Sequence, residues 1–243
     1  MNEILKSIKT PAYVCEEAKV RKNLELLKYV KEQSGAKILV ALKGFAFSGV
    51  MDMVGSYLDG ATCSGLHEAK FASEYVKGEI HTYSPAFKDE DFDEILKISK
   101  HITFNSFAQW QKFKGIALQN GVICGLRVNP EVSLAPTDSY NPCGKFSSAS
   151  SLQVVLEAFE EKFGELIPKM KWINMGGGHH ITRADYDVEL LIKIIRRFRE
   201  KYGVEVYLEP GEAVGWQTGF LISSVLDIVH NEKDTAILDT SAE

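Results

Sequence analysis

Short apolar, strand-like runs alternate with helical segments along most of this sequence, at intervals of roughly 20 to 25 residues. Such alternation is typical of βαβ units and therefore of a parallel sheet. No dinucleotide fingerprint follows the first strand, which favours a (β/α)8 TIM-type barrel over an open doubly wound sheet. Strands are expected at residues 11–14, 38–42, 60–63, 80–83, 102–104, 122–128, 171–175 and 204–208, with helices at 18–33, 50–57, 66–76, 89–98, 107–118, 152–167 and 186–202.

The alternation breaks after Pro130. The next stretch, EVSLAPTDSYNPCGKFSSASS, is rich in serine and proline and can form neither a helix nor a strand of any length. A closed barrel needs one more helix and one more strand before the helix that begins near Leu152, and this stretch leaves no room for them. Either the chain does not form a closed barrel, or about one βα unit of the barrel is absent from it.

Past Pro210 the pattern changes to two consecutive strands, at residues 220–229 and 235–238, around the turn Asn231–Asp234. Consecutive strands after a βα array indicate the start of a second, all-β domain. We therefore expect a barrel domain over residues 12–215 and a partial, truncated β-domain made of residues 216–243 together with residues 1–11.

The composition is that of an ordinary globular protein, with 45% hydrophobic and 25% charged residues. A net charge of −5 gives no basis for a nucleic acid or an anionic membrane as partner. No apolar run approaches the roughly 20 residues of a membrane helix, and Met1–Lys6 lacks the apolar core of a signal peptide. Cys15, Cys63, Cys124 and Cys143 form no C-x-x-C pair, so neither zinc nor disulfides are expected, and reduced thiols fit the cytoplasm.

Lys43 ends the apolar run Ile38–Leu42 and is followed at once by a glycine. A lysine at the end of a buried strand is costly unless its amine has a partner or a function. One interpretation is a lysine whose burial lowers its pKa, so that the amine can form a Schiff base. The other is a lysine that marks the strand end and reaches water. This stretch alone favours the second interpretation.

Three consecutive glycines, Gly176, Gly177 and Gly178, follow a strand and precede a helix. Their backbone N–H groups can approach an anion, and the helix start adds a positive dipole, so a phosphate is the natural ligand. A flexible loop is an equally weighted alternative. His179 and His180 come next, and they suit a metal poorly because neighbours on an extended chain point in opposite directions.

Acidic and basic residues also occur at strand ends. Glu209 ends the next strand, and in a barrel the carboxyl ends of the strands face the active site. A carboxylate that faces a heteroaromatic nitrogen keeps that nitrogen protonated, whereas the alternative is a solvated acidic loop. Glu212 suits a cationic substrate. Arg127, at another strand end, suits a carboxylate or a cofactor ring, or forms a plain surface ion pair.

A strand-end lysine, a glycine cradle and a strand-end glutamate are together what pyridoxal 5′-phosphate (PLP) requires. The lysine would form the Schiff base, the glycines would hold the phosphate, and the glutamate would keep the pyridine nitrogen protonated. With these motifs included, the Schiff-base interpretation of Lys43 is favoured over that of a lysine that only marks the strand end.

Several longer motifs resemble those of the fold-III, alanine racemase-like PLP-dependent decarboxylases. They are ALKGF around Lys43, GLRVNP around Arg127, SYNPCGKFS, NMGGGHHIT and LEPGEAVGWQTGF. Within that family they are most similar to the carboxynorspermidine (carboxyspermidine) decarboxylases. The resemblance extends over nearly the whole chain, from PAYV to ILDTSAE.

The resemblance implies decarboxylation of carboxynorspermidine or carboxyspermidine to norspermidine or spermidine in polyamine biosynthesis, by a homodimer with shared active sites. It also implies a role for each strand-end residue. Lys43 would form the Schiff base, and the phosphate would be bound by Gly176, Gly177, Gly178 and the backbone of Gly211. Glu209 would pair with the pyridine nitrogen, Arg127 would lie near the cofactor ring, and Glu212 would bind ammonium groups of the substrate. Related basic amino-acid decarboxylases carry arginine at the position of Glu212.

The sequence departs from the family pattern in two places. Family members carry a helix and a strand with a ring-stacking histidine before the helix that corresponds to residues 152–167, whereas here the two sides join near Ser147–Ser148. Members also continue past ILDTSAE into a segment that completes the partner's active site.

Two alternative functions remain. One is that of a fold-III decarboxylase acting on ornithine, arginine or diaminopimelate. The other is that of a non-catalytic PLP-binding barrel protein, which the strands after Phe220 disfavour.

Overall fold

The structure is a computed structural model that describes residues 3–132 and 148–241. The whole SYNPCGKFS motif, residues 139–147, lies outside the described residues, and it includes Cys143 and Ser147 of the expected join. The chain divides into two compact units. The larger is Arg21–Trp216, and the smaller combines Met1–Val20 with Gln217–Glu243.

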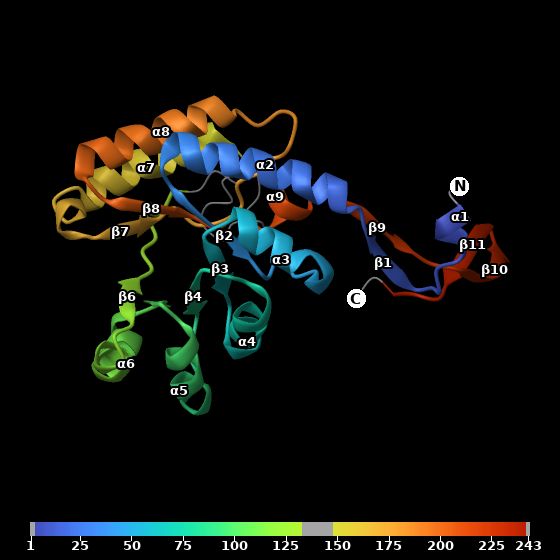
Figure 1. Ribbon diagram of the computed structural model, residues 1–243, viewed down its shortest axis with the longest axis horizontal. Coiled ribbons are helices and arrows are strands. Elements are labelled where there is room, and N and C mark those ends of the chain that lie inside the picture. The colour runs from blue at the N-terminus through green and yellow to red at the C-terminus, as the bar shows by residue number, and fades with distance from the viewer. Residues whose placement is uncertain (1–2, 133–147, 242–243) are drawn as a thin grey trace. The chain divides into compact units, whose positions relative to one another are not determined.

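The larger unit is built around a curled sheet of seven parallel strands (Figure 1). Their order across the sheet is β6-β5-β4-β3-β2-β8-β7. The strands are β2 (Lys37–Ala41), β3 (Gly60–Cys63), β4 (Glu79–Ser84), β5 (His101–Phe104), β6 (Ile123–Leu126), β7 (Trp172–Asn174) and β8 (Glu205–Leu208). Each of the strands predicted between residues 38 and 208 is present, which confirms the predicted α/β barrel class.

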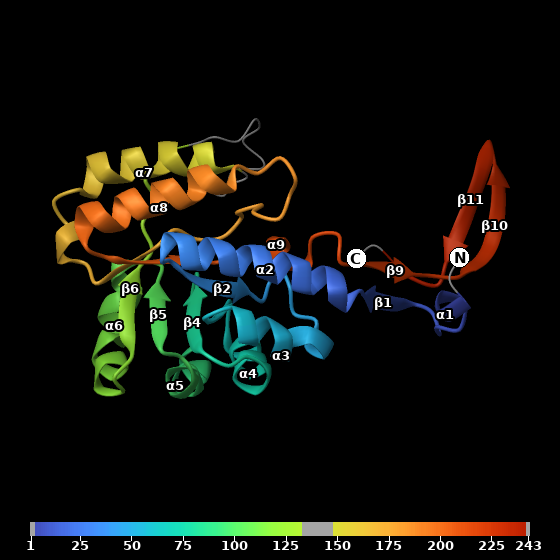
Figure 2. The same ribbon diagram turned by 45° about the horizontal axis from the view of Figure 1, so that its top comes forward.

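Helices connect the strands, and Figure 2 shows α7 and α8 lying side by side. The helices of this array are α2 (Glu17–Ser34), α3 (Ser48–Tyr57), α4 (Leu66–Tyr75), α5 (Asp89–Ile98), α6 (Phe107–Gln119), α7 (Ala149–Phe163) and α8 (Val188–Tyr202). The sequence predicted all of them, although α7 begins three residues before the expected Leu152 and ends at Phe163, four residues before the expected Ile167. Its start is fixed by Ser148, whose hydroxyl accepts the N–H of Ser151 at 3.2 Å.

The ends of α8 follow from its sequence. The side chain of Asp187 accepts the N–H of Leu190 at 2.9 Å and caps the first turn. Gly203 ends the helix in a left-handed conformation with φ +68°, which favours glycine. The residues between them bury one apolar face, formed by Leu191, Ile192, Ile194, Ile195 and Phe198. Capping and amphipathic spacing therefore determine where this helix lies.

The strand before Lys43 lies in the middle of the sheet. β2 pairs with β3 on one side and with β8 on the other, and Ile38, Leu39, Val40 and Ala41 are all buried. A strand covered on both faces needs an unbroken apolar sequence, which is the pattern this run shows. The segment after β2 is therefore held at the centre of the array.

Among the residues that the structure describes, the sheet has one strand fewer than the eight of a closed barrel. Within the described ranges, β6 and β7 are its two edges, since each pairs with a single neighbour. The ring of Trp172 on β7 nevertheless lies against Gly125 on β6, where an added Cβ would come within 2.6 Å of the ring. The sheet thus curls far enough for its two edge strands to meet through one side chain.

The smaller unit contains two antiparallel strand pairs. β1 (Ala12–Cys15) pairs with β9 (Gly219–Ile222), and β10 (Val225–Asn231) forms a hairpin with β11 (Lys233–Leu238). The prediction of one strand over residues 220–229 was wrong, because the chain changes partner there, from β1 to β11. The turn is also tighter than expected, with Glu232 at φ +54° between the paired residues Asn231 and Lys233.

No helix in the described part of the chain combines the length and the apolar character needed to cross a bilayer.

Gly60 offers a test of the strand packing. It opens β3 at φ +152°, and a Cβ here would lie 1.9 Å from the carbonyl oxygen of Glu79. We predict that Gly60→Ala lowers the free energy of unfolding by about 3 kcal/mol or more, because β3 and β4 would have to separate. Chemical denaturation measures this change.

The matched control is Gly115→Ala, inside α6, where a Cβ would meet nothing within 4 Å. This change should stabilise the chain by about 0.5 to 1 kcal/mol through helix propensity. A Gly60→Ala variant as stable as the unmodified chain would contradict the close approach of β3 and β4.

Candidate active site

The residues singled out from the sequence follow four strands of the parallel sheet. Lys43 follows β2, Arg127 follows β6, the run Gly176–Gly178 follows β7, and Glu209 follows β8. Carboxyl ends of parallel strands lie at one edge of the sheet, so all four groups share the same end of the barrel. Because β8 pairs with both β2 and β7, the lysine, the glutamate and the glycines come from three adjacent strands.

Asn174, the last residue of β7, connects the glycine run to Glu209. Its Nδ2 donates to Glu209 Oε1 at 2.6 Å, and its Oδ1 accepts the N–H of Gly176 at 2.8 Å. The backbone N–H of Glu209 donates in turn to the carbonyl oxygen of Gly176 at 2.8 Å. A Cβ at Gly177 would lie 2.5 Å from the carbonyl oxygen of Glu209, so only glycine permits this approach.

Glu209 is half-buried, and its pKa is raised because the surrounding protein removes the carboxylate from water. Four groups oppose this shift: the amide of Asn174, the hydroxyl of Thr62 on β3, and the positive charges of Lys43 and Arg127. The two donors and the two cations all favour the ionised carboxylate. Lys43 and Arg127 therefore both act electrostatically on Glu209 at the strand ends.

Lys43 lies in a turn directly after β2, and its side chain is exposed rather than buried. The backbone around it contacts the segment after β8. Ala41 donates its N–H to the carbonyl oxygen of Pro210 at 3.3 Å, and a Cβ at Gly44 would lie 2.9 Å from the Cα of Gly211. This contact holds Lys43 beside Gly211, and exposure leaves its amine accessible to a ligand.

Arg127 is held by Tyr83, the fifth residue of β4. Its Nη1 donates to the Tyr83 hydroxyl oxygen at 2.5 Å, and the guanidinium carbon lies 5.0 Å from the ring centroid. The Tyr83 hydroxyl donates to Oδ1 of Asn105 at 2.9 Å. The side chain that binds Arg127 is thus a neutral tyrosine rather than the carboxylate of a plain surface ion pair. Tyr83 orients the guanidinium but does not neutralise its charge.

Glu212 is the first residue of α9 (Glu212–Gly215) and binds Arg183. Nε and Nη2 of Arg183 donate to Glu212 Oε1 at 3.1 and 2.5 Å, and the guanidinium lies 4.2 Å from the ring centroid of Trp216. Nε2 of His180 is 3.5 Å from the other oxygen, Oε2. The carboxylate therefore has its charge balanced through Oε1, while Oε2 is the oxygen that a further cation could approach.

His179, next to the glycine run, is buried. Burial lowers its pKa to about 4, although the backbone groups of Met175 and Gly176 favour the protonated form. The imidazole is therefore neutral at neutral pH and adds no charge to this end of the sheet.

Residues of this site that were not predicted from the sequence include Asn174, Thr62 and Arg183. Asn174 had a usable signal, because a polar side chain at the last position of a buried strand needs a partner. Thr62 lies in a run of small residues and Arg183 in a polar loop. Neither has a distinguishing pattern, since their partners lie far away in the sequence.

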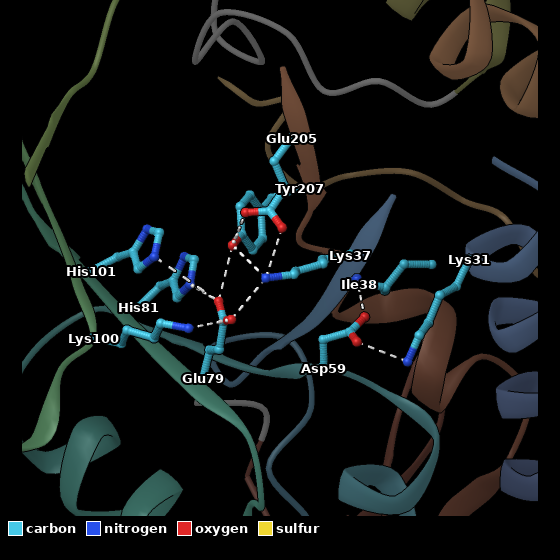
Figure 3. Close-up of polar contacts among 10 residues, drawn as sticks. All are labelled: Lys31, Lys37, Ile38, Asp59, Glu79, His81, Lys100, His101, Glu205 and Tyr207. Carbon is cyan, nitrogen blue, oxygen red and sulfur yellow. Dashed lines mark hydrogen bonds and ion pairs between the residues drawn. The ribbon is translucent and has the colours of Figure 1, made fainter. Parts of the chain in front are cut away.

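A second polar cluster lies at the opposite, amino-terminal end of the strands (Figure 3). At its centre, Glu79 Oε1 accepts hydrogen bonds from the Nζ atoms of Lys37 and Lys100 at 2.8 and 2.6 Å. Glu79 Oε2 accepts the Tyr207 hydroxyl at 3.0 Å and lies 3.2 Å from Nε2 of His81. Burial alone would raise the pKa of Glu79, but the bonds from Lys100 and Lys37 lower it, so this carboxylate stays ionised.

This cluster contains possible metal-ligating atoms. Those of Glu79, His81 and His101 lie within 4.8 Å of one another. Two ammonium groups already bind the Glu79 carboxylate, however, and they would repel a divalent cation placed beside it. We therefore interpret the cluster as structural support, the usual role of the amino-terminal end of a barrel.

Because His81 and His101 of this cluster are buried, we predict that the free energy of unfolding depends on pH. Their rings stack with centroids 4.0 Å apart, and burial lowers the pKa of each from 6.5 to about 4. Between these values the unfolded chain binds protons that the folded chain does not, so stability falls as the pH drops from 6.5 toward 4. His101→Phe keeps a stacked ring and removes one titration, and should reduce this loss by about 1 to 2 kcal/mol.

Urea denaturation at a series of pH values measures the effect. His67→Phe, the same change at an exposed position on α4, is the matched control. If the stability of His101→Phe fell with pH as steeply as that of the unmodified chain, the buried neutral His101 would not be the cause of the acid-induced loss of stability.

Comparison with known proteins places this chain among decarboxylases. It is 56% identical to a carboxynorspermidine/carboxyspermidine decarboxylase of Campylobacter jejuni over 264 aligned positions, which cover 97% of this chain and 69% of the relative. It is 34% identical to a carboxyaminopropylagmatine decarboxylase of Synechocystis sp., over 99% of this chain and 70% of the relative. The chain belongs to the carboxynorspermidine/carboxyspermidine decarboxylase family. No protein-family model matches it.

A solved structure supports the same assignment. The crystal structure of carboxynorspermidine decarboxylase from Campylobacter jejuni, complexed with norspermidine, matches with a TM-score of 0.87 and 54% identity, over 97% of this chain and 68% of that chain. The protein is thus a carboxy-lyase of polyamine biosynthesis. The alignment with the 56%-identical relative is longer than this 243-residue chain, so the relative has residues with no counterpart here, as the seven-stranded sheet leads us to expect.

Proposed function

We propose that this enzyme uses PLP to remove carbon dioxide from carboxynorspermidine or carboxyspermidine, giving norspermidine or spermidine. The 56%-identical relative is named for both substrates, and the 54%-identical crystal structure holds norspermidine. The observation that carries the proposal is the placement of Lys43, the glycine run and Glu209 at the ends of three adjacent strands.

The glycine run fits a phosphate group. Within the described parts of the chain, the N–H groups of Gly177 and Gly178 have no hydrogen-bond acceptor. Together with the backbone of Gly211 they would bind the phosphate oxygens. The N–H of Gly176 is already donated to Asn174, so Gly176 would contribute through the left-handed turn that it makes, with φ +75°.

The side chains around the glycine run have distinct tasks. When bound, PLP supplies an electron sink for the electron pair left on the α-carbon as carbon dioxide departs. The Lys43 amine would hold the cofactor covalently at its aldehyde carbon. Glu209 would hold a proton on the pyridine nitrogen, and Arg127 would lie near the ring as a fixed positive charge. Oε2 of Glu212 would bind an ammonium group of the substrate.

Lys43 is the first test of this assignment. Lys43→Ala should abolish carbon dioxide release from carboxynorspermidine and carboxyspermidine, together with the visible absorbance band of lysine-bound PLP. Lys70→Ala, an exposed lysine on α4, is the control and should change neither. A Lys43→Ala variant with an unchanged spectrum would refute the role of Lys43.

The same assay separates the alternatives. Release of carbon dioxide from ornithine, arginine or diaminopimelate in place of the carboxylated polyamines would assign a different substrate to the enzyme. A protein that shows the PLP band and acts on none of these compounds would be a non-catalytic PLP-binding barrel.

Glu212 is expected to determine affinity for the polyamine chain. Glu212→Gln removes the negative charge and keeps the shape, so we predict a KM higher on the order of 10-fold with little change in kcat. Glu165→Gln, the same change at an exposed position after α7, should leave both constants unaltered. If KM stayed constant in Glu212→Gln, the substrate ammonium groups would bind elsewhere.

We further infer a homodimer with shared active sites and a cytoplasmic location. Large apolar residues of the β10–β11 hairpin are exposed, which supports a protein partner: Val225, Leu226, Ile228, Val229, Ile237 and Leu238. Cys15, Cys63 and Cys124 are free thiols, which suits a reducing compartment. Sedimentation analysis of the purified protein tests the dimer.

A further inference from the structure

Asn174 contacts both parts of the candidate cofactor site through one amide group. The backbone N–H of Gly176 can only donate, so the amide atom facing it at 2.8 Å must be the acceptor Oδ1. The NH₂ group must then face Glu209, whose Oε1 lies 2.6 Å away. The orientation of the amide is thereby fixed from both sides.

The charged and polar groups around the Glu209 carboxylate come from four other elements. They are Asn174 of β7, Thr62 and Cys63 of β3, Lys43 after β2 and Arg127 after β6. Burial raises the pKa of Cys63, so its thiol is neutral and adds no negative charge. Lys43 and Arg127 are exposed, and their attraction is weakened by water. The short hydrogen bond from Asn174 is therefore a principal contact favouring the ionised form.

We propose that Asn174 is a positioning residue for PLP binding, which holds the Glu209 carboxylate with its NH₂ group and the glycine run with its carbonyl oxygen. This inference rests on the proposed function, since it takes PLP as the cofactor. A single side chain then sets the distance between the group that faces the pyridine nitrogen and the loop that holds the phosphate.

Aspartate at this position separates the two tasks of Asn174. Asn174→Asp keeps the size of the side chain and an oxygen for the N–H of Gly176. It replaces the NH₂ donor by a second carboxylate oxygen against Glu209, so the two carboxylates must share a proton or repel each other. The variant therefore disturbs Glu209 while the bond to the glycine run is retained.

The experiment is a titration of PLP-free protein with PLP, followed by absorbance, from about pH 6 to pH 9. We expect Asn174→Asp to bind PLP about 10-fold or more weakly at neutral pH. The ratio of the two affinities should shrink as the pH rises, because Glu209 regains its charge. Titrations of PLP itself occur with both proteins and cancel in this ratio.

Two further variants complete the test. Asn120→Asp, the same change at the end of α6, is the matched control and should bind PLP as the unmodified chain does. If Asn174→Asp does not fold by circular dichroism, Asn174→Ala removes both hydrogen bonds without adding a charge and should still weaken binding about 10-fold.

The outcomes are distinct. If the folded Asn174 variant bound PLP as tightly as the unmodified chain, the proposed role of Asn174 would be overturned. It would also be overturned if Asn174→Asp bound PLP more weakly but the ratio of the two affinities stayed constant with pH. Failure of the unmodified chain itself to bind PLP would instead refute the proposed function.

Discussion

The half-buried carboxylate of Glu209 is the constraint around which the strand ends are arranged. Removing a carboxylate from water is costly, and the cost is offset only if donors and cations converge on it. Here an amide from β7, a hydroxyl from β3 and two cations after β2 and β6 all act on this one group. The same requirement brings the glycine run next to Glu209, because Asn174 binds both.

The two ends of the sheet deal with charge in different ways. At the amino-terminal end, Glu79 is bonded to Lys37 and Lys100, and Lys37 also pairs with Glu205, so the charges balance within the cluster. At the carboxyl-terminal end, Lys43 is exposed and Arg127 is held by a neutral tyrosine. Each lysine of the amino-terminal cluster is thus bonded to a carboxylate. At the carboxyl-terminal end, Lys43 and Arg127 attract Glu209 without a direct ion pair among the described residues, so both can also approach an anionic ligand.

The sequence predicted the barrel array because each strand is a short apolar run and local residues determine where a helix begins and ends. In α8, for example, Asp187 caps the first turn and Gly203 ends the helix. It also placed Lys43, Gly176–Gly178 and Glu209 at strand ends, since parallel strands put those ends together. It could not place Arg183 on Glu212 or Thr62 on Glu209, because such contacts depend on how distant segments fold back. The final preference for a buried Lys43 over one that reaches water was wrong, since an apolar run says nothing about the turn that follows it.

The central claim is that Lys43 holds the cofactor at the end of β2. Borohydride reduction of the PLP-loaded protein converts a lysine-bound cofactor into a stable amine, and peptide mapping by mass spectrometry then locates it. The account predicts one modified peptide, the one that contains Lys43, with the pyridoxyl group on that side chain. A pyridoxyl group on another lysine, or none on any peptide of a protein that releases carbon dioxide from its substrate, would contradict it.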